Sequence, residues 1–129
     1  MRTAKMIPAR RELTTAERDI IEWLLRHGEV GASDYLTHLA YTSVASHCDC
    51  GCPTIGLAVT SAAASVAQPS GIISDVRAVA PEGGDVGLML HATGGFLEEL
   101  EVYPIGETPA TFSLPKIDTI QLLAPNRNM

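Results

Sequence analysis

The chain has 129 residues, of which 46% are hydrophobic and 19% are charged. These values are typical of a globular protein with one domain, and they argue against a chain that is disordered throughout. The formal net charge of -6 opposes non-specific attraction to the phosphate backbone of nucleic acids, so we expect no nucleic-acid partner.

The first segment of the chain, residues 1–12, is basic. It contains Arg2, Lys5, Arg10 and Arg11, and no acid precedes Glu12. A charged terminal segment of this kind is typically solvated, so we expect a flexible tail here. The segment also lacks the apolar centre of a secretory signal peptide.

A helix is predicted over residues 13–27, because apolar residues recur there at helical spacing and charged residues fill the opposite side. Thr14 can cap its N-terminus together with Glu17, three positions further on. Gly28 is expected to end the helix in the left-handed conformation. A second, shorter helix is predicted over residues 33–40, which open with good capping residues.

A series of strand-like runs follows the predicted helices. The runs are rich in β-branched and other apolar residues, and glycine-rich turns separate the later ones at hairpin spacing. They cover residues 41–47, 54–60, 72–80, 86–91 and 96–103. We expect residues 61–71 to be a loop, and we expect the apolar residues after residue 103 to pin the last segment across the sheet.

These elements together predict one α+β domain over residues 1–129. Two N-terminal helices are expected to pack on an antiparallel meander of about four to six strands. No stretch resembles a membrane span, so we expect a cytoplasmic protein without a membrane partner. Such a sheet leaves an edge or a face to protect, and we expect self-association, as a homo-oligomer, or a protein partner.

The most distinctive segment is His47-Cys48-Asp49-Cys50-Gly51-Cys52-Pro53, which holds all three cysteines of the chain. In an extended segment the three sulfurs would project to one face, because side chains alternate along a strand. Convergent thiolates suit Zn²⁺, Cu(I) or an iron–sulfur centre, and a tetrahedral site needs a fourth ligand, for which His47, His38 and His91 are candidates. The candidate metal ligands are therefore Cys48, Cys50, Cys52 and His47.

Two other interpretations of the cysteines stay open. Structural zinc sites usually combine two separated ligand pairs, whereas this chain has one cluster, and buried cysteine also packs as a small apolar residue. A small strained disulfide of Cys50 with Cys48 or Cys52 would be easily reduced, which suits redox chemistry. We therefore expect either no cofactor or Zn²⁺.

His91 is a second residue of interest, because Glu98, Glu99 and Glu101 follow it across a predicted hairpin. A histidine and carboxylates at one place can exchange protons or bind a metal, although a solvated sheet face is more common. The motifs of familiar hydrolases, zinc proteases and nucleotide-binding loops are absent, so we assign no catalytic residue. We expect a non-enzymatic binding or regulatory module, with metal binding or thiol redox chemistry at the cysteine segment as the alternative.

Several stretches of the sequence form a recognisable combination. They are LTTAER at residues 13–18, CDCGCPT at residues 48–54, GLMLH at residues 87–91 and LEELEVY at residues 97–103. Together they resemble a family of small, uncharacterised bacterial proteins that has a CxCGCP motif and the same order of elements. That family has no established activity, so the resemblance implies a bacterial single-domain protein and no catalytic residue.

Overall fold

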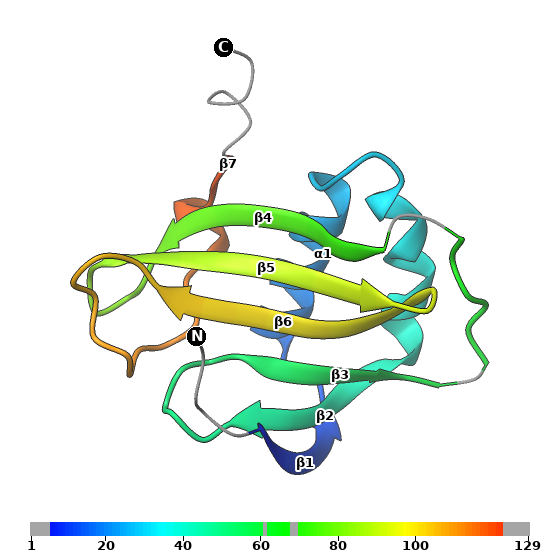
Figure 1. The fold of residues 1–129 in the computed structure, drawn as a ribbon, viewed down its shortest axis with the longest axis horizontal. Coiled ribbons are helices and arrows are strands. Elements are labelled where there is room, and N and C mark those ends of the chain that lie inside the picture. Colours follow the sequence, from blue (N-terminus) through cyan, green and yellow to red (C-terminus); the bar gives the residue numbers. More distant parts are fainter. Residues whose placement is uncertain (1–5, 61, 68–69, 123–129) are drawn as a thin grey trace.

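The computed structural model describes residues 6–60, 62–67 and 70–122, and it has an α+β fold in which helices cover one face of a sheet (Figure 1). The helices are α1 (Thr15–Arg26) and the 3₁₀ helices η1 (Ala32–Tyr41) and η2 (Ile117–Thr119). The strands are β1 (Met6–Glu12), β2 (Thr42–Cys48), β3 (Ile55–Val59), β4 (Gly71–Val79), β5 (Asp85–Thr93), β6 (Phe96–Pro104) and β7 (Gln121–Leu122).

The order of the strands differs from the predicted meander. The sheet has seven strands in the order β1-β2-β3-β6-β5-β4-β7, and all neighbouring strands are antiparallel. The hairpins β2–β3, β4–β5 and β5–β6 form as expected, but β3 pairs with β6 and not with β4. The connection from β3 to β4 is too long for a tight hairpin. The chain therefore passes the positions of β6 and β5 and enters the sheet again beyond them, as β4.

The helices do not come first in the chain, because part of the predicted tail is a strand. Residues 6–12 form the edge strand β1, which pairs with β2 from Met6 opposite Cys48 to Glu12 opposite Ser43. Most of β1 is exposed, and backbone pairing with β2 holds it in the sheet. Such pairing does not require alternating apolar residues, so no pattern in the sequence indicates this strand. Residues 1–5 of the predicted tail lie outside the described residues.

Helix α1 begins as predicted but ends differently. The Thr14 hydroxyl accepts a hydrogen bond from the Glu17 backbone N–H at 3.1 Å, and the Glu17 carboxylate accepts one from the Thr14 N–H at 2.9 Å. Gly28 does not have the positive φ expected of it. Its role is close approach, because a Cβ at this position would lie 2.4 Å from the backbone oxygen of Ile73.

The core lies between the sheet and the helices. Helix α1 runs behind β4, β5 and β6 in Figure 1, and the facing side chains are almost completely buried. Among them are Ile20, Ile21, Leu24, Tyr35, Ile73, Leu88, Leu90 and Leu100. The second predicted helix is present as η1, a 3₁₀ helix, and it packs against α1 and β6.

The last described segment returns to the sheet. Phe112 is buried in the core, Leu114, Ile117 and Ile120 pack against it, and β7 pairs with β4. This agrees with the expectation that the segment crosses the sheet, although Leu123 lies outside the described residues. Among the helices that the structure describes, none is long and apolar enough to cross a membrane.

Candidate metal centre

The three cysteines converge in the turn between β2 and β3. Cys48 is the last residue of β2 and is buried, while Cys50 and Cys52 in the turn are half-buried. The Sγ atom of Cys50 lies 2.7 Å from that of Cys48 and 2.8 Å from that of Cys52. The three sulfurs are all within 4.8 Å of one another. The extended segment expected from the sequence would space Cys48 and Cys52 about 13 Å apart, so the convergence comes from the turn over residues 49–52.

Backbone groups of the turn point at the sulfurs. The N–H of Cys50 donates to Cys48 Sγ at 3.4 Å, and the N–H of Cys52 donates to Cys50 Sγ at 3.3 Å. The thiolate is the form of cysteine that binds metals. Gly51 allows this turn, since its φ is 93° and a Cβ there would lie 2.7 Å from Thr111 Oγ1.

Thr54 anchors the turn to the rest of the sheet. Its side chain is buried, and its hydroxyl donates to the Val102 carbonyl at 3.0 Å and accepts from the Val102 N–H at 2.8 Å. Cys52 Sγ lies 3.4 Å from the same hydroxyl, and the Cys48 N–H donates to the Thr54 carbonyl at 3.2 Å. The cysteine turn is therefore tied at both ends to one buried residue.

The histidines considered as fourth ligands lie elsewhere. His47 is exposed, and its Nδ1 is 3.2 Å from the carbonyl oxygen of Cys48. His38 is completely buried under Phe96, and its Nε2 bonds the carbonyl of Ala64 at 2.7 Å. Neither belongs to the group of sulfurs in the described part of the chain, and His91 belongs to a different group.

Met6 is the neighbour that sequence analysis missed, because residue 6 fell in the predicted tail. It is half-buried and pairs directly with Cys48 across β1 and β2. Side chains at directly opposite positions of antiparallel strands have Cβ atoms about 4.5–5.5 Å apart. The Met6 side chain reaches across β2, because a Cβ built at Gly56 of β3 would lie 3.8 Å from Met6 Cε.

His91 is brought together with two of the three predicted glutamates. Its Nε2 lies 3.0 Å from Glu101 Oε1, and one ligand atom each of His91, Glu99 and Glu101 falls within 4.8 Å. Glu98 is outside this group and bonds Thr93 instead. Within the described part of the chain there are thus two candidate metal sites, one made of sulfur and one made of nitrogen and oxygen.

The cysteine group can bind a soft cation or form a disulfide. The Cys50 sulfur is farther from its two neighbours than the about 2.05 Å of a disulfide. It is about 1 Å closer to them than two sulfurs on a tetrahedral zinc, which lie about 3.8 Å apart with Zn–S bonds of about 2.3 Å. Comparisons of the chain with models of protein families, with curated proteins and with solved structures found no match.

Proposed function

We propose that the protein binds a soft metal ion through the thiolates of Cys48, Cys50 and Cys52. The observation that supports this is the convergence of three sulfurs within 4.8 Å in one hairpin turn. Thiolate is the preferred protein ligand of Cu(I), Zn²⁺ and iron–sulfur centres. In this proposal the β2–β3 turn is the functional part of the molecule, and the sheet holds it in place.

Symmetry of the sulfur positions favours a metal over a disulfide. Cys50 is nearly equidistant from Cys48 and Cys52, at 2.7 Å and 2.8 Å. A disulfide would use two sulfurs and leave the third without a role, whereas a metal uses all three.

Met6 favours Cu(I) over Zn²⁺ as the bound ion. A thioether is a soft, uncharged donor that suits Cu(I), whereas zinc sites in proteins use thiolate, imidazole and carboxylate ligands. Three thiolates with Met6 opposite Cys48 form a set of sulfur donors only. The nitrogen ligand expected from His47 is not needed in this set.

Metal analysis combined with thiol counting tests the proposal. The protein would be purified under reducing, anaerobic conditions and titrated with Cu(I) and with Zn²⁺ in the presence of a competing chelator. We expect one Cu(I) per chain, lost when all three cysteines are changed to serine, with folding checked by circular dichroism. Met6→Leu should weaken Cu(I) binding by at least about tenfold with little change for Zn²⁺. Met89→Leu, on β5, is the matched control and should leave the Cu(I) affinity unchanged.

Each alternative predicts a different result. A thiol-redox protein would show one cysteine pair oxidised reversibly, with no metal retained against the chelator. The non-enzymatic binding module predicts no metal, unchanged folding in the triple serine variant, and a stable oligomer or partner complex. Either result would refute metal binding as the function.

A further inference from the structure

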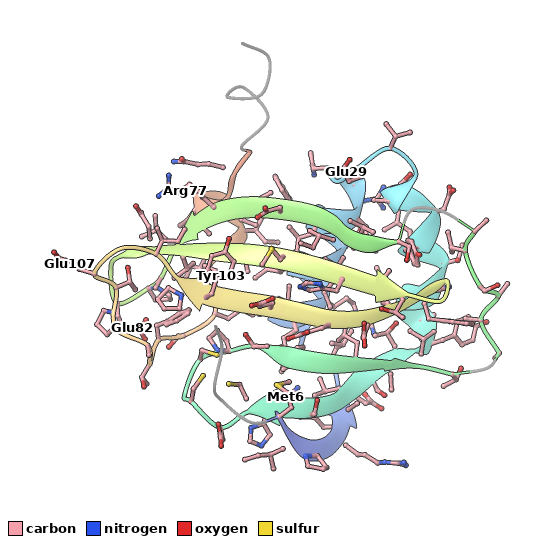
Figure 2. All side chains as sticks on the ribbon, in the orientation of Figure 1. Met6, Glu29, Arg77, Glu82, Tyr103 and Glu107 are labelled. Carbon is pink, nitrogen blue, oxygen red and sulfur yellow. The ribbon has the colours of Figure 1, made fainter. Side chains whose placement is uncertain are left out.

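A second group of ligands lies on the face of the sheet opposite the helices. His91 on β5 pairs with Glu99 on β6. Two residues earlier on β5, Met89 pairs with Glu101 of β6. Alternate residues of a strand share a face, so Glu99, Glu101 and Tyr103 point the same way. Figure 2 shows Tyr103 on the near face of the sheet, whereas α1 lies behind it.

The geometry of this group is that of a partly closed site. His91 Nε2 and Glu101 Oε1 are 3.0 Å apart, and their side chains are 23% and 21% exposed. Glu99 brings a second carboxylate within 4.8 Å of both. The register of β5 and β6 shifts next to His91, and such β-bulges often re-aim a side chain beside a functional site.

The donor atoms of this group are of the kind that first-row divalent cations accept. One imidazole nitrogen and two carboxylate oxygens, from His91, Glu99 and Glu101, lie within 4.8 Å of one another. All three side chains are half-buried, and they come from two neighbouring strands of one sheet.

We propose that His91, Glu99 and Glu101 form a site for a first-row divalent cation, independent of the cysteine turn. One imidazole nitrogen and two carboxylate oxygens suit Mn²⁺, Fe²⁺ or Zn²⁺ and give three protein ligands, with the remaining positions open to water. Thiolates of the cysteine turn prefer softer ions, so the two sites differ in selectivity.

Binding of Mn²⁺ to the intact protein tests this site. Mn²⁺ is paramagnetic, favours oxygen and nitrogen donors, and is quantified by electron paramagnetic resonance. The chain has four histidines, so imidazole signals in the NMR spectrum report the location. We expect one Mn²⁺ per chain, with the His91 signals broadened before those of His27, His38 and His47.

Matched variants separate a metal site from a solvated acidic face. Glu99→Gln and Glu101→Gln keep the side-chain shape and should each weaken Mn²⁺ binding by at least about tenfold. Glu98→Gln removes the same charge from the same strand, outside the group, and should leave the affinity unchanged. The variant with all three cysteines changed to serine should still bind Mn²⁺. This test can therefore fail or succeed independently of the test of the proposed function.

The proposal is overturned by any of three results. These are no saturable binding up to about 1 mM Mn²⁺, equal weakening by Glu98→Gln and Glu99→Gln, or broadening that does not favour His91. If Glu99→Gln disturbs folding, His91→Gln supplies the same test with a neutral side chain of similar reach.

Discussion

Thr54→Val removes one hydroxyl from the buried anchor of the cysteine turn while it preserves the shape of the side chain. The hydroxyl makes two hydrogen bonds, to the carbonyl and to the N–H of Val102, and the side chain is 1% exposed. Each bond contributes about 0.5–1.5 kcal/mol, and a buried N–H left without a partner costs about 1–3 kcal/mol. We therefore expect the free energy of unfolding to fall by about 2–4 kcal/mol, which for a chain of this length lowers Tm by about 8–16 °C.

Urea and thermal unfolding of the metal-free, reduced protein measure this change. Thr37→Val is the matched control, because it makes the same chemical change at an exposed position where the hydroxyl bonds the Asp34 carbonyl at 3.3 Å. Its effect should stay within about 0.5 kcal/mol, as is usual for surface substitutions. The two variants should show the same m-value if both unfold in two states.

A change for Thr54→Val no larger than that for Thr37→Val would refute the reasoning. It would mean that both backbone groups of Val102 find other partners, and that Thr54 does not hold the turn. A large loss of stability with unchanged Cu(I) affinity would be a different failure. In that case Thr54 would stabilise the sheet without positioning the cysteines.

Two further predictions concern helix α1. Glu17→Gln should cost about 1–2 kcal/mol at neutral pH: burial alone would raise the pKa of this carboxyl, but hydrogen bonds from Arg11 and Thr14 outweigh burial and lower it. The difference in free energy of unfolding between the wild type and Glu17→Gln should therefore be complete above pH 4.5, the ordinary pKa of a glutamate, and should shrink as the pH falls through the lowered pKa. Urea unfolding at several pH values measures this difference. A difference that does not change with pH would contradict the account. Gly28→Ala should lower Tm although alanine favours helices, because the added Cβ would lie 2.4 Å from the Ile73 oxygen, and an equal or higher Tm would show that the contact relaxes freely.

The local elements of this fold were largely predictable from the sequence. Strands β3 and β6 lie within one residue of the predicted runs 54–60 and 96–103, because alternation and glycine turns act over a few residues. The capping box of α1 forms as Thr14 and Glu17 indicated. Each of these features depends on neighbours in the chain.

The features that were not predicted depend on distant contacts. Strand β1 has no apolar alternation, and only its pairing with β2 orders it. The β3–β6 pairing joins segments about 45 residues apart, and no local pattern encodes which strands meet across a loop. Gly28 looked like a left-handed cap, yet its constraint comes from Ile73 on β4.

The candidate sites show the same division. The sequence placed Cys48, Cys50 and Cys52 in one group, but alternation along a strand would space successive cysteines about 7 Å apart. The turn that brings their sulfurs within 4.8 Å was not predicted. The proposed role of Met6 depends on the β1–β2 register, and the hydrogen bonds of Thr54 depend on β6, so neither had a signal in the sequence. A methionine opposite a cysteine motif becomes a candidate only when the pairing is known.

The cysteine turn and the stability of the sheet are linked through the junction of β3 and β6. The described register there has two paired positions, Ile55 with Leu100 and Gly56 with Glu99, and the bonds from Thr54 to Val102 extend it. A metal that binds only the folded turn stabilises this junction, and by linkage a looser junction weakens metal binding. Metal at 100 times its Kd adds about 2.7 kcal/mol, which is close to the loss expected for Thr54→Val. Saturating Cu(I) should therefore restore most of the stability of that variant, and the same addition should do nothing for a variant that lacks the three cysteines.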